Sequence, residues 1–341
     1  MLCHVCEYLA LALESPIPNL DASLLASSSR TTVIAIQRSA VIQDTLLTDD
    51  YSGDDSVLIL TCTKVPEASW IRRHEEEEDP SSLFHFLHES LGLTCVTTGL
   101  TSDTQYLVQT AREYLTLLEY TFPTKSYHSF ATHKFVKDAM AQTLRRATDI
   151  RPLAVQTLIV GNNPSYSTMH QKIASLGIYT VDPSGTWKHW GSGLTCIGLY
   201  AETIRRHLLQ KYILLTEENY TSLSMNTHPW EQRAIELAVQ ALLHALLLEE
   251  DVEDVASLSA GSDDKDSIIQ TNTTSLYLDM DRGLRNVPLI FNHGHIHAMV
   301  VHGDEQMMKK NAKKRWGIIS PSFIRDIVRT QIQNATMLST S

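Results

Sequence analysis

The segment that says most about the architecture of this chain reads Ile178-Tyr-Thr-Val-Asp-Pro-Ser-Gly-Thr-Trp-Lys-His-Trp-Gly-Ser-Gly-Leu-Thr-Cys-Ile-Gly198. Its first four residues are β-prone, and Asp182-Pro-Ser-Gly185 is typical of a tight turn, with proline second and glycine fourth. The residues from Thr186 to Trp190 can then run back antiparallel. After Gly198, apolar residues recur at helical spacing up to Tyr212. A hairpin that leads into a helix through small residues favours a helix packed on an antiparallel sheet.

Other elements follow from the spacing of apolar residues. Runs rich in β-branched residues predict strands at 31–37, 57–63, 93–98, 153–160, 289–291 and 296–301. A period of 3.6 predicts helices at 103–120, 127–147, 229–248 and 320–333. The helix at 103–120 has an expected inward stripe of Tyr106, Leu107, Ala111, Tyr114, Leu115 and Leu118. We expect Gly161-Asn-Asn-Pro164 to end the strand before it, and residues 249–283, acidic and poor in aromatics, to form a disordered loop.

The order of these elements places helices in consecutive pairs and strands in antiparallel groups. Two such sheets with helices outside give an α+β fold, a four-layer α/β/β/α sandwich. No glycine-rich phosphate-binding loop is present, and the spacing does not suit a doubly wound parallel sheet.

Composition excludes several classes of protein. The chain has 341 residues, of which 43% are hydrophobic, and a formal net charge of −11. Because nucleic acids and anionic membranes attract Lys and Arg, this acidic balance argues against both as partners. The five cysteines, at positions 3, 6, 62, 95 and 196, are odd in number and predict reduced thiols. We find no apolar run long enough to cross a bilayer and no basic segment typical of a signal peptide.

Five islands of sequence, in order along the chain, carry a family resemblance. They are Thr63-Lys-Val-Pro66, Thr98-Gly-Leu-Thr-Ser-Asp-Thr-Gln105, Arg151-Pro-Leu-Ala-Val-Gln-Thr-Leu-Ile-Val-Gly161, Tyr179-Thr-Val-Asp-Pro-Ser-Gly185 and Trp316-Gly-Ile-Ile-Ser-Pro-Ser-Phe-Ile324. Together they resemble the proteasome alpha-type subunits, and the first resembles the type-6 class. The resemblance implies the Ntn-hydrolase sandwich, a place in a seven-membered outer ring of the 20S core, and no catalysis by this subunit.

The resemblance also implies a domain plan. A single proteasome-type domain spans 31–333, after a divergent N-terminal helix and linker at 1–30 and before a tail at 334–341. Acidic inserts interrupt the domain at about 42–56, 72–80 and 250–287.

The same resemblance implies partners and a location. Partners would be other alpha-type subunits in the ring and beta-type subunits below it, with contact to the regulatory particle left open. The location would be cytoplasm and nucleus, the role would be in ubiquitin-dependent protein degradation, and no cofactor is expected.

Some positions depart from the family pattern. Only Val5 to Ala10 echoes the usual N-terminal helix, and the gate segment before it is missing. Ala154 stands where glycine is common. By alignment, the ring-face lysine that grips activator C-termini falls at His85. Gating and activator docking through this subunit are therefore questionable.

A catalytic alternative stays open. Catalytic relatives use an N-terminal threonine, whose hydroxyl needs its own α-amine or a nearby base, and a lysine beside it. Thr32 and Lys64 have a suitable spacing for this pair. Against it, Arg30 rather than glycine precedes Thr31, and no acid falls at the usual place in the next strand. Moreover, the segment after Ile197-Gly198 reads Leu-Tyr-Ala-Glu202, whereas catalytic relatives carry Gly-x-x-Asp there. A free-standing scaffold that has lost ring assembly is the third interpretation.

Two metal patterns and one charged pair complete the candidates. His293, His295 and His297 alternate, so they could present zinc ligands on one strand face or simply a half-exposed face. The Cys3-x-x-Cys6 pair has no second half. We interpret Asp103 and Arg112, on one helix, as a cap and a surface ion pair.

Overall fold

A computed structural model gives the fold of the chain. The residues it describes are 22, 24, 26, 31–38, 56–63, 83–88, 93–121, 132–147, 151–164, 174–218, 230–259, 296–302 and 316–340.

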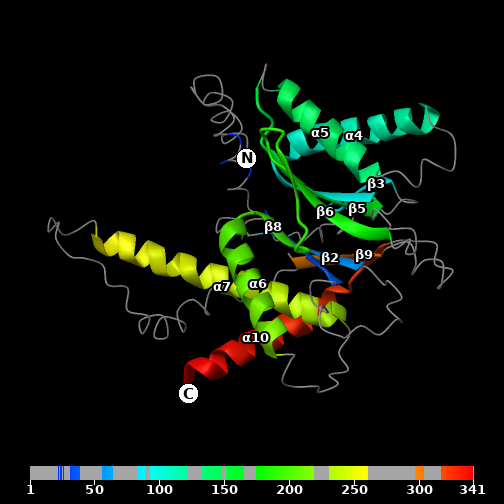
Figure 1. The fold of residues 1–341 in the computed structure, drawn as a ribbon. Coiled ribbons are helices and arrows are strands. Elements are labelled where there is room, and N and C mark those ends of the chain that lie inside the picture. Colours follow the sequence, from blue (N-terminus) through cyan, green and yellow to red (C-terminus); the bar gives the residue numbers. More distant parts are fainter. Residues whose placement is uncertain are drawn as a thin grey trace.

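Two antiparallel sheets form the centre of the described structure (Figure 1). The first sheet has the order β10-β9-β2-β1-β8, with bounds Trp316–Ile318, Ile296–His302, Ser56–Thr63, Thr31–Gln37 and Leu194–Gly198. The second sheet has the order β3-β4-β5-β6-β7, with bounds His85–His88, Leu93–Gly99, Val155–Pro164, Ala174–Val181 and Trp187–His189. Every paired strand runs antiparallel to its neighbour, as predicted.

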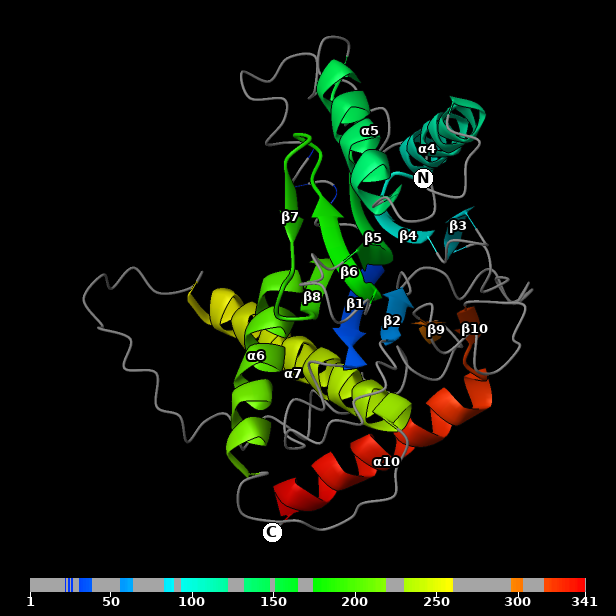
Figure 2. The ribbon, with the colours of Figure 1, turned by 45° about the vertical axis from the view of Figure 1, so that its right-hand side comes forward.

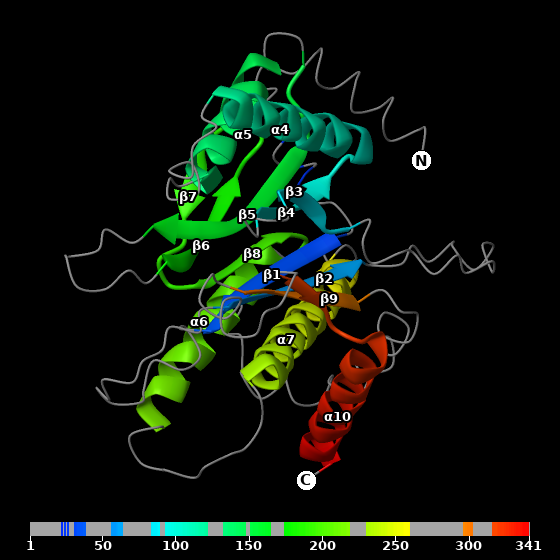
Figure 3. The same cartoon turned by 90° about the vertical axis from the view of Figure 1, so that its right-hand side faces the viewer.

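Helices cover the outer face of each sheet. The second sheet carries α4 (Thr101–Thr121) and α5 (Thr132–Ala147). The first sheet carries α6 (Ala201–Glu218), α7 (Trp230–Ser259) and α10 (Pro321–Thr340). Figure 3 shows the resulting layers edge-on, with α4 and α5 above the two sheets and α6, α7 and α10 below. The predicted four-layer α/β/β/α sandwich is confirmed.

Alternating side chains divide each sheet between two hydrophobic cores. Ile34 and Ile36 of β1 face the helices of the first sheet, whereas Val33 and Ala35 face the second sheet. A third core lies between the second sheet and α4 and α5, and includes Ile159. This period of two is what a strand buried on both faces requires.

The predicted hairpin is confirmed. Val181 pairs with Trp187 and Tyr179 with His189, and the turn is closed by the Gly185 N–H, which donates to the Asp182 carbonyl at 2.8 Å. Gly185 has a φ of 73°, a conformation that favours glycine. Beyond β7 the chain crosses from the second sheet to β8 of the first, which Figure 2 shows from the side.

The structure corrects three predicted endings. Gly161 to Pro164 do not stop β5, because they pair with Ala174 to Gly177 of β6. Residues 249–259 belong to α7 and are not a loop. The helix α10 continues past 333 to Thr340, so most of the expected tail is helical.

Two further differences concern surface residues. The strand β3 was not predicted, because four residues are too few to show a period. Tyr106 is 58% exposed and does not belong to the inward stripe of α4, whereas Leu107, Ala111 and Leu115 are buried.

Residues 127–131 and 289–291, and the inserts at 42–55 and 72–80, lie outside the described residues. No described helix is both long and apolar enough to cross a membrane.

Candidate functional site

Thr32, the candidate nucleophile, lies within β1 and not at its exposed end. It pairs with Cys62 of β2 on one side and Gly198 of β8 on the other. Its side chain shares the strand face of Ile34 and Ile36, toward the helices, and the residue is only 4% exposed. Its hydroxyl donates a hydrogen bond to the Leu199 carbonyl at 2.9 Å.

The backbone that receives this hydrogen bond turns sharply at Gly198. Gly198 has a φ of 86°, and Tyr200, two residues later, has a φ of 60°. The Gly198 N–H donates to the Gln156 side-chain oxygen at 3.2 Å, and the Leu199 N–H donates to the Thr31 carbonyl at 3.2 Å. These bonds join the start of β1 to the end of β8 and, through Gln156, to the second sheet.

This geometry has a chemical consequence for the hydroxyl. A threonine nucleophile must give its proton to a base, such as a free α-amine, as it attacks. The Thr32 hydroxyl instead donates to a peptide carbonyl, which is a hydrogen-bond acceptor but not a base at neutral pH. The nitrogen of Thr32 is a peptide nitrogen within the strand, since Thr31 precedes it and pairs with Thr63. Lys64, the proposed neighbour, lies outside the described residues.

We predict that the Thr32 hydroxyl contributes to stability. In T32V the side chain keeps its shape but the part-buried Leu199 carbonyl loses its donor, so the free energy of unfolding should fall by about 1–2 kcal/mol. Chemical denaturation measures this change. In the control T116V, an exposed α4 hydroxyl that bonds the Arg112 carbonyl is removed, and the change should stay within about 0.5 kcal/mol. Equal stabilities of T32V and wild type would contradict the prediction.

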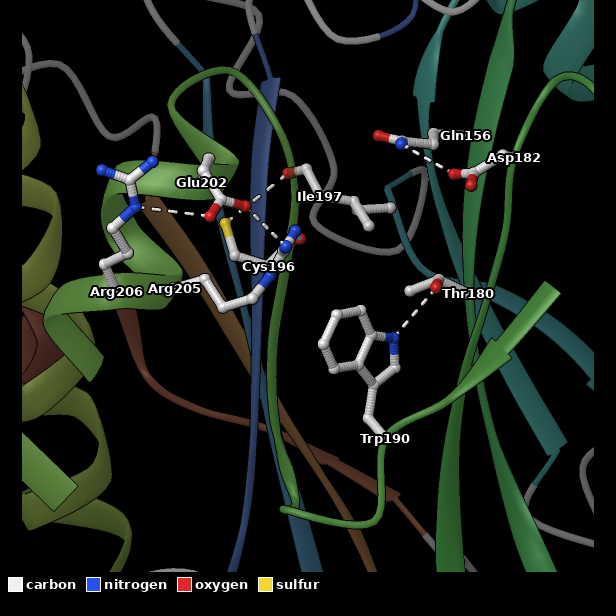
Figure 4. Close-up of polar contacts among 9 residues, drawn as sticks. All are labelled: Gln156, Thr180, Asp182, Trp190, Cys196, Ile197, Glu202, Arg205 and Arg206. Atoms are coloured by element: carbon white, nitrogen blue, oxygen red, sulfur yellow. Dashed lines mark hydrogen bonds and ion pairs between the residues drawn. The ribbon is translucent and has the colours of Figure 1, made fainter. Parts of the chain in front are cut away.

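Glu202, the acid nearest in sequence to Gly198, is engaged by arginines. Its carboxylate oxygens lie 2.7 Å from Arg205 Nη1 and 3.4 Å from Arg206 Nε (Figure 4). Its side chain is 60% exposed. It therefore belongs to a surface cluster at the first turn of α6 and has no described contact with Thr32.

Trp190 joins the two sheets at this corner (Figure 4). Its indole N–H donates to the Thr180 hydroxyl of β6 at 2.9 Å. Its ring lies 4.8 Å from the Arg205 guanidinium carbon and 3.9 Å from Lys188 Nζ, both within cation–π range. Arg205 also donates to the Cys196 carbonyl of β8 at 3.3 Å. The Gln156 amide donates to Asp182 at 2.9 Å, so the hairpin turn is tied to β5 as well.

Asp103 forms a buried contact that the sequence did not indicate. It is 2% exposed, and both of its oxygens accept from Arg151, with Nη1 to Oδ2 at 2.8 Å. The same carboxylate accepts from the Ala154 N–H at 3.0 Å. The interpretation of Asp103 as part of a surface ion pair with Arg112 is therefore wrong. Arg112 instead donates from Nε and Nη2 to the Phe86 carbonyl, at 3.3 and 3.1 Å.

A comparison with protein-family models matches residues 85–254 to the proteasome subunit family. The matched span runs from the start of β3 into α7 and contains the whole of the second sheet, β8, α4, α5 and α6. Residues 85–254 form a proteasome subunit domain. Its sandwich is the Ntn-hydrolase fold, as expected from the resemblance, and the family places its function in protein degradation by proteasome assemblies. A search of curated proteins finds no match.

His85, the residue expected from the resemblance to fall at the activator pocket, begins β3 at the edge of the second sheet. It pairs with Cys95 of β4. Burial, and then the Arg112 charge, lower the pKa of its imidazole below the usual value. The residue after it in β3 is Phe86, whose carbonyl accepts the two hydrogen bonds from Arg112 of α4. Phe86 also stacks on Trp316 of β10, with ring centroids 4.2 Å apart, so the edges of the two sheets meet here.

Of the residues that the sequence suggested as metal ligands, the structure describes only His297. His297 is 7% exposed and shares the strand face of Met299 and Val301, toward the second sheet, so the half-exposed face expected for it is wrong. His293, His295, Cys3 and Cys6 lie outside the described residues. Among the residues described, no group of three or more His, Cys, Asp or Glu is arranged to hold a metal ion.

Proposed function

We propose that this chain is a non-catalytic, alpha-type structural subunit of the outer ring of a 20S proteasome. The observation that carries the proposal is the state of Thr32. It is the buried second residue of β1, paired with Cys62 and with Gly198, and its hydroxyl donates a hydrogen bond to the Leu199 carbonyl. A threonine in this arrangement contributes to the sandwich and does not attack peptide bonds. The alpha-type islands at 63–66, 98–105 and 316–324, with the type-6 form of the first, support the same assignment.

Exposed apolar residues on α4 support a role in assembly. Tyr106, Leu117 and Tyr120 are 58%, 61% and 83% exposed, and the last two follow the first by about three and four helical turns. These residues, which we name the α4 stripe, therefore lie along one side of the helix. Large apolar side chains aligned in this way are typical of surfaces that contact another protein. We propose that the α4 stripe contacts another proteasome subunit.

The proposed partners are other alpha-type subunits, beta-type subunits and, through the outer face, the regulatory particle. The proposed location is the cytoplasm and nucleus, and the proposed process is ubiquitin-dependent degradation. Reduced thiols are consistent with this location, since Cys62 and Cys95 are buried without disulfides, and burial raises the pKa of each to about 12. Closed rings form when each subunit presents two different surfaces to its neighbours.

The first test is assembly. Tagged full-length chain should co-purify with alpha-type and beta-type subunits, and native mass spectrometry should find it in a ring-sized complex. The variants L117D and Y120D should reduce recovery of these subunits at least about tenfold, because a charge in an apolar contact must be desolvated. Q105D, which adds the same charge to α4 outside the α4 stripe, should assemble normally. Recovery of the wild-type chain only as a monomer would reject the proposal and favour a free-standing scaffold.

Peptidase assays distinguish the proposal from the catalytic alternative. Complexes that contain T32V should keep each peptidase activity of the wild-type complex. Loss of one activity in a complex that assembles normally would instead assign Thr32 as a nucleophile.

A further inference from the structure

Two histidines stack on each other between α6 and α7. The rings of His207 and His244 have centroids 4.3 Å apart and planes tilted by 34°. His207 precedes Leu208 in α6, and His244 lies between Leu243 and Ala245 in α7, all of which belong to the core of the first sheet. The histidine pair therefore borders the apolar contact by which α6 and α7 pack together. Figure 1 shows the two helices crossing on the outer side of the first sheet.

The surroundings of the pair disfavour positive charge. Burial lowers the pKa of His207 to about 4, with further lowering from His244 and from Lys211, one turn along α6. His244 is itself an exposed residue, yet partial burial of its ring, and then the Lys211 charge, also lower its pKa. Of the carboxylates described on these two helices, Glu202 binds Arg205 and Arg206, and Glu236 accepts from Gln232. On the other side of α7, the neutral side chain of Gln240 bonds Gln331 of α10, and the adjacent strand β8 contributes the buried thiol of Cys196.

The hydrogen bonding of the ring nitrogens is a second reason why protonation of His207 is unfavourable. The buried Nε2 of His207 has no hydrogen-bond partner among the described residues. A protonated imidazole is a donor at both nitrogens, so protonation would create a donor at this point without an acceptor. A neutral ring can present an unprotonated Nε2 there at a smaller cost.

We propose that the His207–His244 stack is an acid-sensitive contact, which holds α6 against α7 at neutral pH and releases them when either ring is protonated. Protonation would place a charge on a ring that stacks on the other imidazole and lies near the Lys211 ammonium. The loss of packing would be confined to α6 and α7 while the sheets stay paired. This inference concerns the fold of the subunit and does not depend on its catalytic state.

The pH window follows from the direction of the shifts. Because the folded state holds its protons less tightly than the unfolded one, stability from the neutral pair is complete above the unfolded pKa of about 6.5. It is lost as the pH falls from about 6.5 toward 4. Since the His207 ring is only partly buried, we expect the opening equilibrium of α6 and α7 to rise about tenfold between pH 7 and pH 5.

Hydrogen exchange of the full-length chain tests the inference. At pH 5, after correction for the intrinsic exchange rate, amides of α6 and α7 should lose about tenfold more protection than amides of α4 and α5 in the same sample. The double variant H207F/H244F keeps two stacked rings without a titrating group, so its helices should lose protection equally. His85 and His189 also have lowered pKa values from burial, and they stay in this variant as an internal control.

Two further measurements keep the test decisive if the double variant folds poorly. In K211Q, which changes an exposed side chain, both imidazoles should titrate at higher pH and the acid sensitivity should shrink. NMR titration of the wild-type chain should find both imidazoles ionising below pH 6.5. Ionisation at or above that value, or equal loss of protection in all four helices, would overturn the proposal.

Discussion

In D103A, the free energy of unfolding should fall by about 3–4 kcal/mol, the largest loss that we expect from a single side chain in this protein. The mutation removes both carboxylate oxygens that accept from Arg151, and with them the acceptor of the Ala154 N–H. Breaking a buried ion pair costs several kcal/mol, because the remaining charge has lost its compensation. The Arg151 side chain keeps 27% exposure, so water recovers part of that cost, which places the estimate near the lower end of the range.

Chemical denaturation of matched variants would test this prediction. D138N removes a carboxylate that is 47% exposed and lies 3.8 Å from Lys137 Nζ, and it should change stability by no more than about 0.5 kcal/mol. D103N should be intermediate, since an amide oxygen can still accept from Ala154 but carries no charge. Equal stabilities of D103A and D138N would contradict a structural role for the buried pair.

The sequence predicted the parts of the fold that depend on local periodicity. The hairpin at 178–190 and the strand at 31–37 were placed correctly, since their turn residues and β-branched runs lie within a few residues of each other. The inward positions of α7, such as Ile235 and Leu242, were also correct, because a long apolar stripe is hard to mistake.

The rest depends on contacts between distant segments. Pairing with Ala174 to Gly177 carries β5 through Gly161 to Pro164, although glycine, asparagine and proline all favour turns. Tyr106 looked inward because tyrosine is partly apolar, but packing of α4 on the second sheet uses Leu107 and Val108. Burial of one face cannot be assigned until the partner surface is known.

The contacts of the candidate site depend even more on segments that are far apart in the sequence. Asp103 and Arg151 are 48 residues apart in sequence, and no local pattern relates them. The islands at 98–105 and 151–161 each contain one member, so the resemblance marked both without giving their contact. The Thr32 hydroxyl likewise bonds a carbonyl 167 residues away. Sequence could nominate the threonine, but only the turn at Gly198 gives the geometry of its hydroxyl.

That turn leads to the second large effect, in which G198A should lose about 3 kcal/mol of stability. Gly198 has a φ of 86°, where an L residue costs about 1–2 kcal/mol. A Cβ there would also lie 2.1 Å from the Thr31 carbonyl oxygen and 3.0 Å from Thr98 Cγ2 of the second sheet. Because the first neighbour is backbone, β1 must move away from β8, and overpacking of this kind costs another 1–3 kcal/mol, about 2 here.

Gly191, on the loop that connects β7 with β8, provides the matched control for this prediction. A Cβ at Gly191 meets no atom within 4 Å, so G191A should stay within about 0.5 kcal/mol of wild type by chemical denaturation. G198A should also weaken the pairing of Thr32 with Gly198, and amides at the start of β1 should exchange faster than those of β4. If G198A and G191A were equally stable, the close approach of β8 to Thr31 would not constrain the fold. The turn at Gly198 would then not be what holds Thr32 in its buried pairing.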